Sequence, residues 1–133
     1  MCLILLVEDH KLMAEVLVNA LHKKGNFKVA DVAGTAEEAL VCLSEREVDL
    51  ALVDVVLPHT SGIDLVSIIQ ERYPQLPCLM ISGRSASDYV KRSLDAGARG
   101  YVLKDDIFDV VKGVRHVLEG GTYLSKQIAD GKT

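Results

Sequence analysis

The sequence predicts an α/β fold in which helices cover both faces of a parallel sheet. Five apolar runs alternate with five segments of helical periodicity along the chain, and such alternation is typical of parallel sheets. The run Leu50–Val53 is apolar at every position, as expected for a strand buried on both faces. The chain has 133 residues, the size of one domain, and shows no sign of a second one.

Strand and helix patterns alternate through the first half of the chain. The first predicted strand is Leu3–Val7. A helix follows, with apolar residues at helical spacing: Leu12, Met13, Val16, Leu17, Ala20 and Leu21. Residues 27–33 predict a less buried strand near an edge of the sheet. Thr35 is predicted to cap the next helix, with Glu38 as its capping-box partner, and a third helix is predicted over residues 62–73.

The second half continues the alternation. Strands are predicted over residues 78–81 and 100–103, and the helix between them has the thinnest apolar stripe, formed by Ala86, Val90 and Leu94. Asp106 is predicted to cap the last helix, which has the most regular stripe: Ile107, Val110, Val111, Val114, Val117 and Leu118. Two glycines at 120–121 end it, and the remaining residues read as a polar tail.

Polar residues follow the predicted strands where each strand ends. Glu8 and Asp9 follow the first strand, and Asp54 ends the third. Ser82 follows the fourth strand and Lys104 the fifth. Because the carboxyl ends of parallel strands lie on the same side of a sheet, these residues are expected to converge on one crevice, where such sheets bind ligands. Asp54 alone could be an ion-pair partner, a nucleophile or a metal ligand.

The types of these residues indicate phosphoryl chemistry. Three carboxylates brought together repel one another, so the site favours a divalent cation, and oxygen ligands that leave positions for water and phosphate suit Mg²⁺. An aspartate such as Asp54 can attack phosphorus to give an acyl phosphate. Lys104 offers positive charge to the phosphoryl oxygens, and the Ser82 hydroxyl and nearby backbone N–H groups offer hydrogen bonds.

These motifs resemble the receiver domain of bacterial two-component response regulators, over residues 2 to about 124. The resemblance is carried by Glu8-Asp9, Asp54 with Pro58 and Gly62 after it, Ser82-Gly83, and Tyr101 three residues before Lys104. It implies a flavodoxin-like (βα)5 doubly wound parallel sheet with strand order 2-1-3-4-5. It also implies a phosphorylation-activated signalling switch, not an enzyme, whose phosphodonor is a sensor histidine kinase.

By this resemblance each matching residue has an expected role. Asp54 would be the phosphoacceptor, and Lys104 would hold the phosphoryl group together with the backbone of Gly83. The implied ligands of Mg²⁺ are Glu8 (largely through water), Asp9, Asp54 and the backbone carbonyl of Val56. Ser82 and Tyr101 would be a switch pair. Phosphorylation would draw in the serine hydroxyl, move the tyrosine ring from exposed to buried, and change the face formed by the fourth helix, fifth strand and fifth helix.

Further details resemble the NarL/LuxR type of response regulator: Asp9-His10, residues 95–101, Lys104-Asp105 and residues 120–125. Such regulators usually continue into a helix-turn-helix domain. We therefore expect a receiver domain over residues 1–121. Residues 122–133 would be a polar tail or the start of a linker to an effector domain that is absent from this chain. DNA would be contacted only through that domain, and phosphorylation would favour a homodimer.

Two alternative functions on related folds fit the sequence less well. A phosphatase of the haloacid-dehalogenase type needs a second acid two residues after its nucleophile, and Val56 occupies that position. A flavin-binding module needs a phosphate loop rich in Ser, Thr and Gly after the first strand, where this chain has Glu-Asp-His. Val56 and Arg84 are expected to flank the path of a hydrolytic water, and Val56 cannot orient one, so self-dephosphorylation should be slow.

Composition excludes several other classes. The net charge of −4 does not indicate a nucleic-acid surface, and no apolar run approaches the ~20 residues of a membrane span. A strand begins within two residues of the N-terminus, which leaves no room for a signal peptide, so we expect a cytoplasmic protein.

The cysteines Cys2, Cys42 and Cys78 lack metal-binding spacing and are expected to be small buried hydrophobes.

Overall fold

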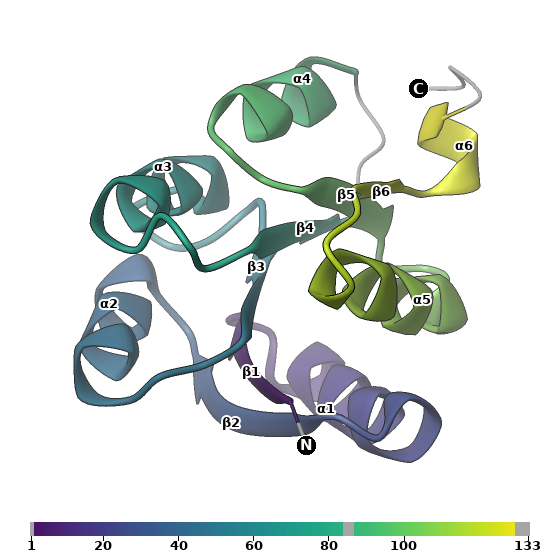
Figure 1. Cartoon of the computed structure of the whole chain (residues 1–133), viewed down its shortest axis with the longest axis horizontal. Helices are drawn as coiled ribbons and strands as arrows, with labels where there is room; N and C mark the ends of the chain where they lie inside the picture. Colours follow the sequence, from purple (N-terminus) through teal and green to yellow (C-terminus); the bar gives the residue numbers. More distant parts are fainter. Residues whose placement is uncertain (1, 84–86, 130–133) are drawn as a thin grey trace.

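The structure, a computed structural model, describes residues 2–83 and 87–129 (Figure 1). Strands and helices alternate along the chain, as predicted. The strands are β1 (Leu3–Val7), β2 (Lys28–Ala33), β3 (Leu50–Asp54), β4 (Cys78–Ser82), β5 (Gly100–Leu103) and β6 (Tyr123–Leu124). The helices are α1 (Lys11–Gly25), α2 (Ala36–Glu45), α3 (Gly62–Arg72), α4 (Ser87–Asp95), α5 (Ile107–Leu118) and α6 (Lys126–Ala129).

All strands pair in parallel, in the order β2-β1-β3-β4-β5-β6. The predicted order 2-1-3-4-5 is therefore confirmed, with a sixth strand added beyond β5. The central strand β3 is buried at every position, whereas β2 lies at an edge and is mostly half-exposed, as predicted. Such an arrangement places the carboxyl ends of β1, β3, β4 and β5 side by side.

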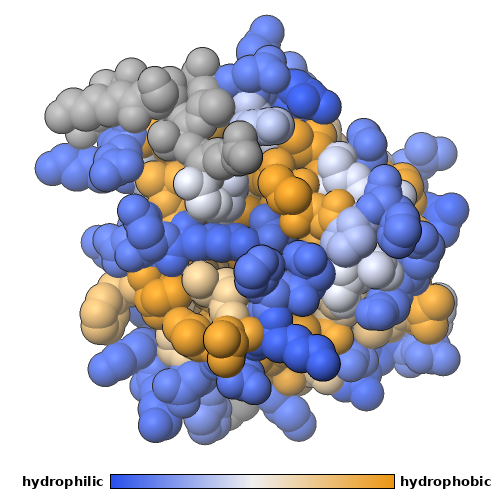
Figure 2. All heavy atoms as spheres, turned by 180° about the vertical axis from the view of Figure 1, so that it is seen from behind, coloured by the Kyte–Doolittle hydropathy of each residue, from blue (hydrophilic) through white to orange (hydrophobic). Residues whose placement is uncertain are grey.

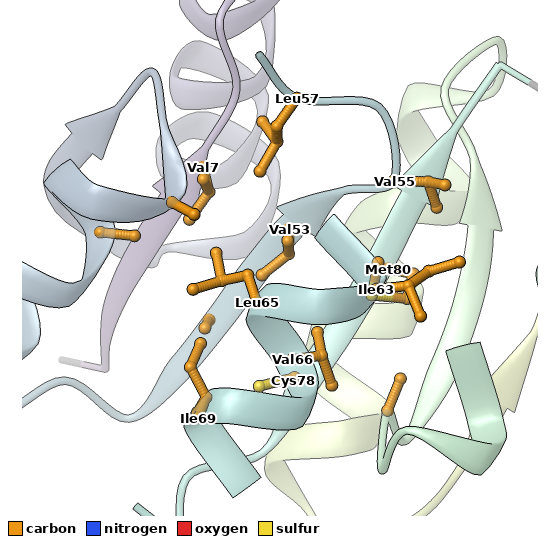
Figure 3. Close-up of a cluster of buried hydrophobic side chains, with 14 of the residues drawn as sticks. Val7, Val53, Val55, Leu57, Ile63, Leu65, Val66, Ile69, Cys78 and Met80 are labelled. Carbon is orange, nitrogen blue, oxygen red and sulfur yellow. The ribbon is translucent and has the colours of Figure 1, made fainter. Parts of the chain in front are cut away.

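Helices cover the two faces of the sheet in separate layers, with α1 and α5 on one face and α2, α3 and α4 on the other (Figure 1). Each layer closes its own apolar core. In the core beneath α3, the side chains of Leu65, Val66 and Ile69 point toward Val53 of β3 and Met80 of β4 (Figure 3). Burial of these apolar chains is the main stabilising term, and it fixes the strands whose ends carry the polar residues.

The predicted caps Thr35 and Asp106 are present, but the Glu38 carboxylate accepts from the Gly34 amide at 3.0 Å and not from the Thr35 amide that a capping box requires. The Thr35 hydroxyl accepts a hydrogen bond from the Glu38 amide at 3.1 Å, and an Asp106 oxygen accepts one from the Asp109 amide at 3.1 Å. A further cap that the sequence analysis missed is Ser61, whose hydroxyl accepts from the Asp64 amide at 3.1 Å. Each cap satisfies a backbone N–H that the first turn of a helix leaves without a partner.

The apolar residues that indicated α1 by their helical spacing do not all face the core. Leu12 is 77% exposed and Val16 is 47% exposed, while the buried residues of the helix are Ala14, Leu17, Ala20, Leu21 and Gly25. Successive helical residues lie about 100° apart, so the exposed pair forms a neighbouring stripe that faces solvent. Other large apolar residues at the surface are Val32, Val41, Val56, Leu94 and Phe108. Figure 2 shows hydrophobic residues at the surface as separate patches among hydrophilic ones.

The expected polar tail is also wrong for residues 123–129. Tyr123 and Leu124 pair with Gly100 and Tyr101 of β5, and α6 follows directly. Ile128 is only 7% exposed and belongs to the apolar core on the α4 side of the sheet. This segment therefore folds as part of the domain. Ala86, which was expected to contribute to the α4 stripe, lies outside the described residues.

Candidate functional site

A crevice of about 540 Å³ opens at the carboxyl ends of the strands. The residues that line it are Asp9, His10, Asp54, Val56, Leu57, Pro58, Ser82, Gly83 and Lys104. The loops after β1, β3, β4 and β5 thus contribute to one site, as the strand-end argument predicted. Ligands of open parallel sheets bind at this position.

Asp54 is placed by β3 and by the turn that follows it. Asp54 is only 4% exposed. Its backbone lies so close to the start of α3 that a Cβ on Gly62 would be 1.9 Å from the Asp54 carbonyl oxygen. The Gly62 amide donates to the Val55 carbonyl at 2.8 Å. Only glycine fits this close approach, so Gly62 fixes where the chain turns after the aspartate.

Lys104 joins the two buried carboxylates of the crevice. Its Nζ lies 2.7 Å from Asp54 Oδ2 and 2.7 Å from Glu8 Oε1. The other oxygens are also held, because Asp54 Oδ1 accepts from the Val56 amide at 3.1 Å and Glu8 Oε2 accepts from the His10 amide at 3.2 Å. Residues from the ends of β1, β3 and β5 therefore form one charged cluster.

The cluster changes the acidity of its members. Burial raises the pKa of Asp54 to about 6; Glu8 beside it adds to the rise, and the hydrogen bond from Lys104 opposes it. Burial lowers the pKa of Lys104, but pairing with Asp54 and Glu8 outweighs burial, so that its pKa lies above the ordinary value. One cation is therefore shared by two buried acids, which leaves this pair short of positive charge.

The cluster suits a hard cation. Glu8, Asp9 and Asp54 each offer a carboxylate oxygen, and these oxygens lie within 4.8 Å of one another. Glu8 Oε1 is buried and has the Lys104 ammonium as its partner, at 2.7 Å. Glu8 and Asp54 are buried, whereas Asp9 is exposed at the rim. An all-oxygen donor set with one open side fits Mg²⁺.

The remaining predicted site residues occupy different surroundings. Ser82 ends β4, is buried, and accepts a hydrogen bond from the Lys104 amide through its carbonyl at 2.9 Å. Gly83 and Val56 both line the crevice, and Val56 is 58% exposed. Tyr101 does not line the crevice. It is fully buried in the core on the α4 side, so the exposed ring that was expected before phosphorylation is not what the structure shows.

His10 lines the crevice next to Asp9, although the sequence analysis gave it no role at the site; its position directly after the acidic pair was the only signal. Arg84, expected to flank a hydrolytic water, lies outside the described residues.

In the described part of the chain, no helix is long and apolar enough to cross a membrane.

Comparison with known families decides between the readings of this crevice. A family model for the response regulator receiver domain matches residues 4–115. The chain belongs to this family. Receiver domains are phosphorylation-controlled switches of two-component systems, partner with sensor kinases and bind Mg²⁺ at an acidic pocket. The receiver domain described here has such an acidic cluster in Glu8, Asp9 and Asp54.

Relatives of this receiver domain are transcriptional regulators. The transcriptional activator ExaE of Pseudomonas putida is 35% identical over 127 residues, which cover 95% of this chain and 59% of ExaE. The regulator MctR of Rhizobium johnstonii is 32% identical over 128 residues, which cover 96% of this chain and 60% of MctR. The chain thus spans little more than half the length of these curated relatives.

Solved structures share the whole fold. A LuxR-family response regulator from Aurantimonas sp. superposes with a TM-score of 0.94 at 26% identity, covering 99% of this chain and 95% of that one. The receiver domain of NarL from Mycobacterium tuberculosis has a TM-score of 0.84 at 28% identity, covering 90% and 97% of the two chains. The predicted resemblance to NarL/LuxR-type receiver domains is confirmed.

Proposed function

We propose that Asp54 accepts a phosphoryl group from a phosphohistidine of a sensor kinase. The observation that carries this proposal is a buried carboxylate at the end of β3 that opens onto the crevice and is held by the ammonium of Lys104 at 2.7 Å. A carboxylate oxygen of Asp54 would form the new P–O bond while the P–N bond of the donor breaks. The donor imidazole keeps the electron pair of that bond.

Glu8, Asp9 and Asp54 would hold Mg²⁺ together with the backbone carbonyl of Val56, with Glu8 acting largely through water. Support comes from the three carboxylate oxygens within 4.8 Å of one another and from the single ammonium, that of Lys104, shared by the buried carboxylates of Glu8 and Asp54. Bound there, the ion would neutralise negative charge on the carboxylates and on the phosphoryl oxygens. It would also bring the pKa of Asp54 back down, so that the residue is ionised and nucleophilic at neutral pH.

Three other groups would receive the phosphoryl oxygens. Lys104 already lies against the Asp54 carboxylate, so a phosphoryl group on that carboxylate would be within reach of its ammonium. The Ser82 hydroxyl and the backbone N–H of Gly83, at the end of β4 between β3 and β5, would donate hydrogen bonds to the phosphoryl oxygens. Charged and neutral donors of this kind stabilise developing negative charge on transferred phosphoryl groups.

The domain is a signalling domain, and its own chemistry would be limited to phosphorylating and dephosphorylating itself. We expect Mg²⁺-dependent self-phosphorylation from small phosphodonors. Loss of the phosphoryl group should be slow, because the exposed side chain of Val56 at the crevice mouth has no group that could orient an attacking water.

The output would pass through the α4–β5–α5 face or through a homodimer. Shifting a two-state equilibrium from 1:99 to 99:1 needs roughly 5.5 kcal/mol of preference for one state. A few charge-assisted hydrogen bonds of about 1.5–3 kcal/mol each, from Lys104 and Ser82 to the phosphoryl group, could supply it. Since Tyr101 is already buried, the phosphoryl group would stabilise this inward ring and not create it.

The wider context is inferred from the relatives. We propose that the receiver domain, with β6 and α6 included, is the phosphoacceptor unit of a transcriptional regulator. DNA would be bound only by a separate effector domain, as expected for a chain that matches little more than half of its regulator relatives. The cytoplasm, where sensor kinases phosphorylate their regulators, is the proposed location.

Solution NMR and sedimentation with beryllofluoride, which mimics a phosphoryl group on aspartate, test the switch. In the presence of Mg²⁺ we expect shifts in α4 and at Tyr101, and stronger self-association. The same additions to Asp54→Asn should change nothing. If the shifts of the unmodified protein remain confined to the strand ends around Asp54, and its association state does not respond, then the proposed output is wrong.

A further inference from the structure

The segment Tyr123–Ala129, which we call the C-terminal clip, is bonded to β5, the strand that contains Tyr101 and ends directly before Lys104. Its β6 residues pair with Gly100 and Tyr101 of β5, and the Ser125 amide donates to the Tyr101 carbonyl at 3.1 Å. Figure 1 shows β6 and α6 at the end of the sheet, next to β5. The clip therefore contacts the chain between the core tyrosine and the crevice lysine.

Asp109 of α5 anchors the clip through two hydroxyls. One carboxylate oxygen accepts a hydrogen bond from Tyr123 Oη, and the other accepts one from Ser125 Oγ at 2.6 Å. Burial raises the pKa of Tyr123 to about 12, and the hydrogen bond to Asp109 adds to that rise, so the phenol remains a donor at any physiological pH. Both carboxylate oxygens are thus used to hold the clip against α5.

Ser125 extends this anchor to the backbone of β5. The residue is 3% exposed, and its Oγ accepts a hydrogen bond from the Leu103 amide at 3.0 Å. Leu103 directly precedes Lys104, whose own amide donates to Ser82 at 2.9 Å. A chain of hydrogen bonds thus runs from Asp109 through Ser125 to the backbone from which the Lys104 side chain reaches the crevice.

Packing leaves little freedom between the clip and its neighbours. A Cβ on Gly100 would lie 2.2 Å from the Tyr123 carbonyl oxygen, and one on Gly113 of α5 would lie 3.0 Å from the Tyr123 ring. Ile128 belongs to the same buried cluster as Tyr101 and Leu103. Undocking the clip would therefore uncover the end of the core that contains the tyrosine, and would leave the Leu103 amide without its acceptor.

We propose that Asp109 and Ser125 are positioning residues for Lys104, and that docking of the C-terminal clip and phosphorylation of the crevice favour the same state. With the clip docked, the Lys104 ammonium lies 2.7 Å from the Asp54 carboxylate, which is where a phosphoryl group on Asp54 needs it. Coupling between two sites is reciprocal. A phosphoryl group that holds Lys104 in this place therefore tightens the clip. This proposal rests on the proposed function of Asp54.

The test compares Ser125→Ala with the unmodified protein and with Ser44→Ala as a control. Ser44 is an exposed serine of α2 whose hydroxyl bonds only locally, to the Val41 carbonyl at 2.7 Å. Hydrogen exchange of residues 123–129 is measured with and without Mg²⁺ and beryllofluoride, together with the rate of labelling by acetyl phosphate. A buried amide that loses its acceptor shifts such an equilibrium by about tenfold.

We expect beryllofluoride to slow exchange in the clip of the full chain and of Ser44→Ala. In Ser125→Ala the clip should exchange about tenfold faster, and both beryllofluoride affinity and labelling rate should fall. Tyr123→Phe removes only the hydrogen bond to Asp109 and keeps the one from the Leu103 amide to Ser125, so it should disturb folding less. It should speed exchange in the clip but lower the labelling rate less than Ser125→Ala does.

The outcomes separate the two proposals. If beryllofluoride leaves every amide near Asp54 unchanged, the proposed function fails. If those amides respond while exchange in the clip is unchanged or faster, or if Ser125→Ala labels at the rate of Ser44→Ala, then the clip is only structural and the coupling is refuted.

Discussion

The raised pKa of Asp54 predicts that its charge destabilises the metal-free fold. Between pH 3.8, the ordinary pKa, and about 6, the folded-state pKa, the folded chain keeps a proton that the unfolded chain has released. Stability therefore falls as pH rises through this window. The difference between these two pKa values corresponds to about 3 kcal/mol. Because the carboxylate opens onto the crevice, and water screens it there, we expect roughly 1–2 kcal/mol.

Replacing Asp54 with asparagine should recover this energy. In chelator at pH 7.5, the free energy of unfolding measured in urea should be higher for Asp54→Asn than for the unmodified protein by roughly 1–2 kcal/mol. This difference in unfolding free energy should disappear as the pH is lowered toward 4. Asp64→Asn, which removes an exposed aspartate of α3, should change stability by less than about 0.5 kcal/mol. If Asp54→Asn is less stable than the unmodified protein at pH 7.5, or if the difference in their unfolding free energies does not depend on pH, the electrostatic reasoning is refuted.

Three further changes, the last with a glycine control, test other parts of the site. Lys104→Ala should retain Mg²⁺ binding but label with acetyl phosphate roughly 100-fold more slowly; loss of metal affinity with normal labelling would contradict its assignment to the phosphoryl group. Val56→Asn should shorten the lifetime of the phosphorylated protein, and an equal or longer lifetime would disprove the role given to Val56. Gly62→Ala should cost about 3 kcal/mol or more in thermal unfolding, because its Cβ would overlap the Asp54 carbonyl. Gly83→Ala, whose Cβ would meet no described atom within 4 Å, should cost less than about 0.5 kcal/mol.

Features that depend on local sequence were predictable. The apolar run before Asp54 indicated a strand buried on both faces, and β3 is buried throughout. Once the strands were predicted to be parallel, the convergence of Glu8, Ser82 and Lys104 followed from geometry, because each lies at the carboxyl end of its strand. No distance was needed to place them at one crevice, and they all lie there or against it.

Features that depend on tertiary packing were not predictable. The rotation of α1, which exposes Leu12, is set by how the helix fits the sheet, and an apolar pattern broader than one face does not determine it. The sixth strand has only two residues, too few to show periodicity. It pairs with β5 and is held by hydrogen bonds from Ser125 and Tyr123 to Asp109, which lies 16 and 14 residues earlier in the chain. The inward ring of Tyr101 likewise depends on the core that surrounds it.

The central claim is that Asp54 alone accepts the phosphoryl group and that the reaction needs a divalent ion. Intact mass spectrometry after incubation with acetyl phosphate and Mg²⁺ tests both parts in one measurement. We predict a mass increase of one phosphoryl group in the unmodified protein, none in Asp54→Asn, and none for either protein in excess chelator. Labelling of Asp54→Asn, or full labelling of the unmodified protein in chelator, would contradict the account.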